Sequence, residues 1–165
     1  MLILGIDPGT AITGYGLDRE EDDVLTLVDC GVITTPSGQP LPERLQIIYR
    51  GLADLVDQHP PAAAAVEELF FSRNARTALS VGHARGVTLL ALADAGLPIY
   101  EYKPLEIKKA IAGYGGADKR QVQEMVRMLL NLEDVPRPDD AADAVAVAVC
   151  HIHSARMAAL IADAE

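Results

Sequence analysis

Four carboxylates stand in apolar surroundings in this sequence. Asp7 ends the first apolar run, and Glu67 ends a second one near the middle of the chain. Asp140 and Asp143 head an alanine- and valine-rich stretch near the C-terminus. An ionised carboxylate is costly in such surroundings unless a positive charge compensates it. Because no run of Lys or Arg lies near these four in the sequence, the pattern predicts that a bound metal ion supplies that charge.

The ligand chemistry of this set indicates which ions and which reaction to expect. Asp140 and Asp143 are three residues apart and therefore share one face of a helix. A cluster with oxygen ligands alone selects Mg²⁺ or Mn²⁺ over zinc. Two such ions about 4 Å apart can hold a phosphodiester, activating water on one side and stabilising the leaving oxygen on the other. The carboxylates therefore predict a phosphodiester-hydrolysing site.

The spacing alone leaves three points open. Asp7 also suits a turn-forming role, because its side chain can accept N–H groups of the turn that follows. Glu67 and Glu68 end the same predicted strand and must point to opposite faces of its sheet, so periodicity does not select between them. Asp139 and Asp140 open the last helix, and one of them is expected to cap it.

The elements that must position these residues follow from apolar periodicity and turn signals. Strands are predicted at 2–7, 12–17, 24–34, 62–68 and 97–102. Helices are predicted at 42–58, 75–95, 104–112, 118–130 and from 139 to near the C-terminus. The acidic stretch 18–23 is interpreted as a turn. This order predicts one α/β domain over residues 1–165, with a mixed sheet flanked by helices and a helical tail after about residue 154.

Composition is typical of a protein of the reducing cytoplasm. Half of the 165 residues are hydrophobic, and the two cysteines make neither a disulfide framework nor a zinc site. No signal peptide or membrane-spanning run is recognisable. The net charge of −10 argues against a nucleic-acid partner, but residues 73–127 carry nine basic and five acidic side chains, a local net charge of +4. That segment is compatible with a phosphate-binding face, although composition alone favours ordinary solvated helix charge.

Several motifs, in order along nearly the whole chain, resemble the RuvC family of Holliday-junction resolvases. The first are LGIDPGT at residues 4–10 and TGYG at residues 13–16. The others are VEELF at 66–70, GHARG at 82–86, GYGGADKRQVQ at 113–123 and DAADA at 140–144. The resemblance implies a ribonuclease-H-like fold, with three antiparallel strands followed by two parallel ones, and cleavage of four-way DNA junctions.

Carried over residue by residue, the resemblance also implies roles for particular side chains. The family's metal ligands fall on Asp7, Glu67, Asp140 and Asp143, with about two Mg²⁺ ions per subunit and Mn²⁺ as a substitute. Residues expected to contact DNA are Phe70, Arg73, Arg76, Lys108 and Lys119. Phe70 matches the aromatic residue that the family inserts at the junction centre, where it would stack on an unpaired base. Asp139 is an acid beyond the family's pattern.

The resemblance further implies a homodimer, because resolution needs two symmetric nicks, and a branch-migration motor complex of the RuvA-RuvB type as partner. Gly82 and Gly86 suit either a core contact or that dimer interface. A different class of protein, a sugar- or acetate-kinase-like ATP-binding fold, also opens with a Gly-Ile-Asp-x-Gly-Thr loop, but that fold needs about twice this length. A junction-binding module with a degenerate site is a third possibility, and the presence of all four carboxylates argues against it.

Overall fold

The computed structural model describes residues 1–68 and 74–163. Its strands are β1 (Leu2–Asp7), β2 (Ile12–Glu21), β3 (Val24–Thr34), β4 (Ala63–Glu67) and β5 (Ile99–Tyr102). Its helices are α1 (Leu41–Gln58), α2 (Ala75–Asp94), α3 (Pro104–Ala112), α4 (Lys119–Leu129) and α5 (Asp139–Ala162). Within the described part of the chain, every predicted strand and helix is therefore present.

The strands form one mixed sheet in the order β3-β2-β1-β4-β5. β2 runs antiparallel to both β1 and β3, whereas β4 is parallel to β1 and β5 is parallel to β4. Three antiparallel strands are thus followed by two parallel ones, which confirms the predicted fold class. The parallel pairing of Ile6 with Val66 sets the carboxyl ends of β1 and β4 side by side.

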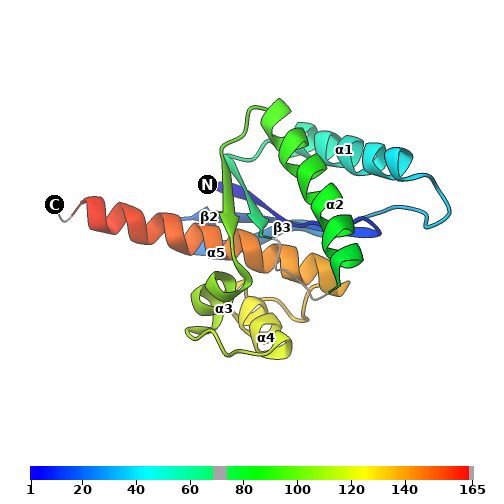
Figure 1. Cartoon of the computed structure of the whole chain (residues 1–165). Coiled ribbons are helices and arrows are strands. Elements are labelled where there is room, and N and C mark those ends of the chain that lie inside the picture. The colour runs from blue at the N-terminus through cyan, green and yellow to red at the C-terminus, as the bar shows by residue number, and fades with distance from the viewer. Residues whose placement is uncertain (69–73, 164–165) are drawn as a thin grey trace.

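Helices cover both faces of the sheet (Figure 1). On one face, Leu4 and Ile6 of β1 are fully buried in a cluster with residues of α1 and α2. On the other face, Ile3 is buried in a second cluster that includes the apolar residues of α5 between Val145 and Ile152 and parts of α3 and α4. Alternate residues of β1 thus serve two cores, which explains why its sequence is apolar without interruption.

Helix α5 lies directly on the backbone of the sheet. A Cβ atom at Gly5 would stand 2.1 Å from the carbonyl oxygen of Ala144, and one at Gly14 would stand 1.9 Å from the carbonyl oxygen of Asp140. Glycine at these two positions is therefore required for the helix to approach so closely. The approach places the acidic first turn of α5 over the strands next to Asp7.

Helix α5 is also long and apolar enough, by length and composition alone, to cross a membrane. Half of that apolar window is buried inside the protein, against the sheet, as in the core helix of a globular protein. Beyond the sheet the helix continues alone to the C-terminal end (Figure 1), where Met157, Leu160 and Ile161 are exposed.

Two sequence predictions about acidic residues are wrong. The stretch 18–23 is not a turn: β2 continues to Glu21, and the reversal occurs at Asp22 and Asp23, which both have positive φ. The long ladder with β3, which includes a bulge between Leu17 and Asp18, keeps the strand extended despite its charges. Neither of the two acids that open α5 caps it, because Pro138 takes the N-cap position and no side chain bonds the first turn.

Candidate active site

Two of the four carboxylates stand at neighbouring strand ends. Asp7 and Glu67 end β1 and β4, one residue beyond the paired Ile6 and Val66. Burial, together with the negative charges of Glu67, Asp143 and Asp140, raises the pKa of Asp7 to about 8. In its protonated form Asp7 donates a hydrogen bond to Glu67. This pair is therefore a site where negative charge is crowded and partly withdrawn from water.

The other two carboxylates come from the first turns of α5. Burial raises the pKa of Asp143, and the ammonium group of Lys119, 2.8 Å away, opposes that rise. Burial and Asp143 likewise raise the pKa of Glu67, against the influence of Asp7, Lys119 and Lys108. Charged side chains from two strands and three helices therefore interact in this one site.

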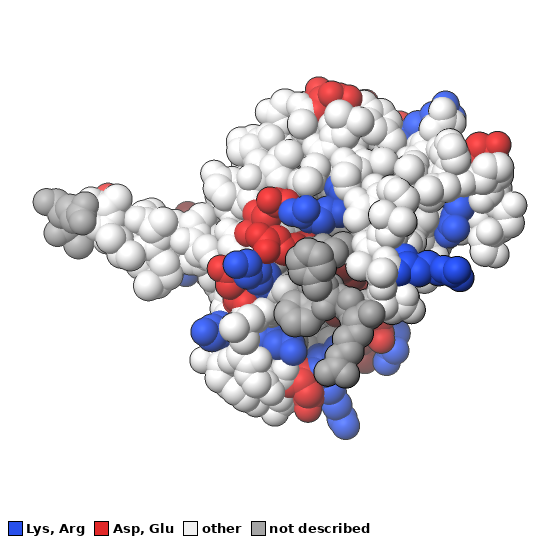
Figure 2. Space-filling model, in the orientation of Figure 1, with Lys and Arg blue, Asp and Glu red and all other residues white. Residues whose placement is uncertain are grey.

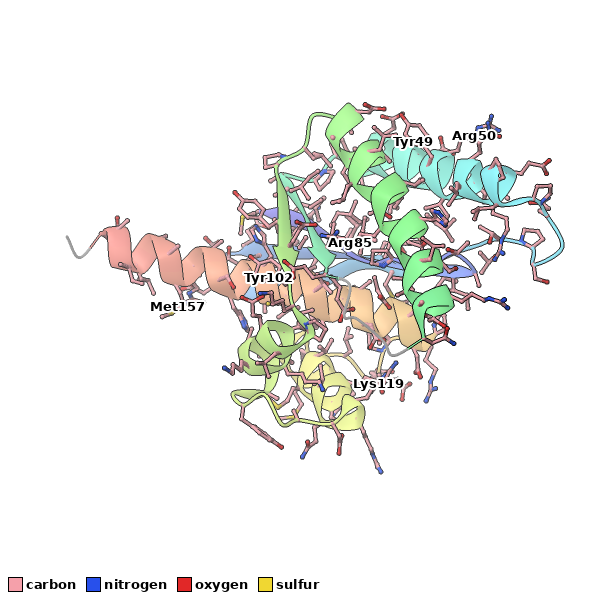
Figure 3. The ribbon with its side chains drawn as sticks, viewed as in Figure 1. Tyr49, Arg50, Arg85, Tyr102, Lys119 and Met157 are labelled. Atoms are coloured by element: carbon pink, nitrogen blue, oxygen red, sulfur yellow. The ribbon has the colours of Figure 1, made fainter. Side chains whose placement is uncertain are left out.

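A pocket of about 260 Å³ opens beside these groups. Its lining combines two carboxylates, two lysines and four apolar residues: Glu67, Asp143, Lys108, Lys119, Pro104, Ile107, Val122 and Ala146. Figure 3 shows Lys119 at the start of α4, close to the first turns of α5. Acidic and basic side chains also intermix near the middle of the face in Figure 2. Such a mixture suits a negatively charged substrate: the lysines can attract its charge, and the carboxylates lie beside its reacting group.

The donor set fits a hard divalent cation. All four side chains offer oxygen ligands, and the carboxylates of Asp7, Glu67 and Asp143 resist ionisation because they are buried together. A divalent ion would relieve that crowding. In the described part of the chain, no three His, Cys, Asp or Glu side chains are placed so that they could already hold an ion. The fit thus rests on ligand chemistry and charge.

The predicted DNA-contacting residues fall into three groups. Lys108 and Lys119, to which the family resemblance assigns DNA contact, line the pocket. Arg76 is exposed in the first turn of α2, outside the pocket lining, and its backbone N–H donates to the Asn74 side chain. Phe70 and Arg73 lie outside the described residues.

The structure also separates Asp139 from its neighbour. Its side chain is 59% exposed, lies 3.8 Å from the Lys119 ammonium group and accepts a hydrogen bond from Gln123. Asp139 therefore faces α4. Sequence reasoning missed Gly14 as a site determinant, although an isolated glycine inside a strand is a signal for close backbone approach.

The strand order and the carboxylates at adjoining strand ends, with a helix laid across them, define a nuclease of the ribonuclease-H-like class. Comparison with known proteins narrows this class. A sequence profile of the family described as crossover junction endodeoxyribonuclease RuvC matches residues 3–151. The protein of that name from Roseiflexus sp. (strain RS-1) is 63% identical over 154 residues, which cover 93% of this chain and 92% of the relative. The chain therefore belongs to the RuvC family of crossover junction endodeoxyribonucleases.

Solved structures agree with this assignment. The structure of T. thermophilus RuvC in complex with Holliday junction substrate has a TM-score of 0.91 and 39% identity, over 96% of each chain. The yeast mitochondrial Holliday junction resolvase Ydc2 has a TM-score of 0.69 over 92% of this chain and 77% of its own, and at 14% identity it supports the fold alone. Membership of the family decides against the kinase-like alternative.

Proposed function

We propose that this protein cuts four-way DNA junctions by metal-dependent hydrolysis of phosphodiesters, with Asp7, Glu67, Asp140 and Asp143 as the metal ligands. The observation that carries the proposal is the burial of Asp7 together with its convergence with the other three acids, which raise its pKa to about 8. Family membership supplies the substrate: the related T. thermophilus protein was solved with a Holliday junction. Resolution of such junctions belongs to DNA recombination and repair.

The carboxylates and the two lysines of the site have different roles in this proposal. Mg²⁺, or Mn²⁺ in its place, would activate water and stabilise the leaving oxygen when bound by the four carboxylates. Lys119 holds Asp143 in place through their 2.8 Å ion pair and favours the ionised form of that carboxylate against the effect of burial. Lys108 lines the same pocket and would contact a phosphate of the DNA backbone. The expected products carry 5′-phosphate and 3′-hydroxyl ends.

The decisive experiment is a nicking assay on a synthetic four-way junction with Mg²⁺ or Mn²⁺. Wild type should make paired symmetric nicks, and Asp7→Asn should bind the junction without cutting it. Asp57→Asn, an exposed change in α1, is the matched control and should cut like wild type. If wild type binds the junction but leaves it intact with either metal, the proposed activity is wrong.

We also propose that two copies associate through the exposed face of α2. Nothing lies within 4 Å of a Cβ atom built at Gly82 or Gly86, so these glycines do not serve a core contact. Exposed Leu79 and Leu90 flank them on the same helix face. Small residues between leucines allow two helices to approach closely, and a dimer would present two sites for two nicks.

Sedimentation analysis tests the dimer directly. Gly86→Glu should shift wild-type dimers toward monomers, because the two copies of the new carboxylate would face each other, while Gly38→Ala on an open loop should not. A monomeric wild type at assay concentration would contradict this arrangement. A branch-migration motor as partner and a cytoplasmic location complete the proposal. The two free cysteines agree with that compartment.

A further inference from the structure

The turn that follows Asp7 is tied to a helix far away in the sequence. Thr10, only 5% exposed, donates a 2.5 Å hydrogen bond from its hydroxyl to the backbone carbonyl of Ser80 in α2. The Ser80 hydroxyl in turn donates to the Thr10 hydroxyl over 3.0 Å. Two hydrogen bonds therefore join residues 70 positions apart and tie the turn after Asp7 to α2.

A second set of bonds holds the same turn from its other side. The Thr35 hydroxyl, beyond the end of β3, donates to the Thr10 carbonyl over 2.5 Å, and Arg44 of α1 donates its Nε–H to the Thr35 hydroxyl. Within the turn, the Thr13 hydroxyl donates to the Gly9 carbonyl. The turn is thus clamped between α1 and α2, with Thr10 as the residue that reaches α2.

The location of this link explains what it would do. Thr10 follows Asp7 by three residues, and α2 is the first helix after Glu67 in the chain. The Thr10–Ser80 link therefore joins the turn that leaves β1 to α2. Once both are ionised, Asp7 and Glu67 repel each other, so a turn anchored to α2 opposes the movement of Asp7 away from Glu67.

We propose that Thr10, through its hydrogen bonds to Ser80, is a positioning residue that holds Asp7 at the distance from Glu67 required for the site to bind its metal ions. This rests on the proposed metal-dependent function. Thr10 acts through Asp7, and its hydroxyl is committed to protein groups. Its loss should therefore change metal affinity and reaction rate, and leave affinity for the junction unchanged.

The test compares Thr10→Val, which has the same shape without the hydroxyl, with Thr10→Ser, which keeps the hydroxyl. Ser154→Ala is the control, because Ser154 donates a similar bond to the Cys150 carbonyl on α5. One readout is the Mn²⁺ concentration that gives half the maximal thermal stabilisation of the DNA-free protein. The other is the single-turnover nicking rate at saturating junction, alongside the junction dissociation constant.

For Thr10→Val we expect a higher Mn²⁺ midpoint and a nicking rate lower by about ten- to hundredfold, the usual cost of a misplaced reacting group. Junction affinity should stay within about twofold, as should every measure for Thr10→Ser and Ser154→Ala. Ser80→Ala keeps the backbone carbonyl that accepts from Thr10. Its Mn²⁺ midpoint and nicking rate should therefore change less than those of Thr10→Val. Equal midpoints and rates for Thr10→Val and Thr10→Ser would overturn the proposal. A wild type that cuts no junction would refute the proposed function instead, and the Mn²⁺ midpoints would still test the link.

Discussion

Gly14 and Asp140 are in contact through their backbones: a Cβ atom at Gly14 would stand 1.9 Å from the Asp140 carbonyl oxygen. Gly14 is also the residue paired with Asp7 across β1 and β2. Gly14 therefore lies between Asp7 of the sheet and the first turn of α5, which carries Asp140 and Asp143. The spacing of the site is set where the backbones of β2 and α5 meet.

Gly14→Ala should disturb the site more than the fold. The added methyl group must push the first turn of α5 away from β2, at a cost of about 1–3 kcal/mol in the free energy of unfolding. We expect nicking to fall by at least about tenfold, because Asp140 and Asp143 move with the helix. Urea unfolding and single-turnover nicking measure the two effects. Gly38→Ala, where nothing lies within 4 Å, should change neither, and unaltered nicking by Gly14→Ala would contradict the role of the contact.

Lys119→Met should shift the pH dependence of nicking. Lys119 lowers the pKa values of Asp143 and Glu67, so its loss raises both and leaves more of each carboxylate protonated at a given pH. The acidic limb of the pH–rate profile should therefore move to higher pH, with a rate near pH 7 lower by about tenfold. Unfolding free energy should change by less than about 1 kcal/mol, because the pair is half-exposed.

Arg120→Met is the matched control for that experiment. Arg120 is the next residue of α4, exposed and outside the pocket lining. Its loss should leave the pH–rate profile in place. If both variants lose activity equally, without a shift of the profile, Lys119 contributes only general attraction for DNA.

The metal-free protein should become less stable as the pH rises. The pKa of Asp7 is about 8 in the folded protein and about 4 in an unfolded chain, so the stabilising contribution of its proton is complete below pH 4 and lost on the way to pH 8. Asp7→Asn should therefore be more stable than wild type at pH 8 by about 1–3 kcal/mol in the presence of a chelator. Urea unfolding measures the difference. Excess Mg²⁺ should reverse the order, because it stabilises wild type through binding, and an order unchanged by Mg²⁺ would count against Asp7 as a ligand.

Asp18 offers a second, independent pH effect away from the site. Both of its carboxylate oxygens are buried without a hydrogen-bond partner, and burial raises its pKa well above the usual value. Its proton stabilises the fold at low pH, and that contribution is lost as the pH rises through the raised pKa. Asp18→Asn should therefore exceed wild type in stability by about 1–3 kcal/mol near pH 8 and match it near pH 3, in thermal melts. Asp22→Asn, exposed in the adjoining turn, should show no such difference.

Much of the fold could be predicted from the sequence because its patterns are local. Alanine prefers helix, but the short alanine-rich segment between two helices needs a partner in the sheet, and it forms strand β4. The length of β2 could not be predicted this way. Pairing with β3 holds Asp18 in a strand, and that tertiary gain outweighs the local preference of acidic residues for turns.

The site was predictable only in part, for a related reason. Residue types pointed to Asp7, Asp140 and Asp143, but the alternation of a strand could not choose between Glu67 and Glu68. The structure puts Glu67 in the pocket with Asp143. Capping rules favoured Asp139 or Asp140 at the N-cap, whereas Pro138 occupies it. The hydrogen bonds between Thr10 and Ser80 depend on the tertiary arrangement, and nothing in the local sequence indicates them.

The bare contact of α5 with the sheet limits how the protein can be redesigned. Most enzyme cores let a designer move a helix by exchanging large side chains for small ones at its interface. Here the glycines at positions 5 and 14 already place backbone against backbone, so no smaller residue remains to bring α5 closer. At the proposed metal site, a shorter distance between ligands from α5 and from the sheet would therefore have to come from longer acidic side chains, such as Asp143→Glu, since α5 cannot move closer to the sheet.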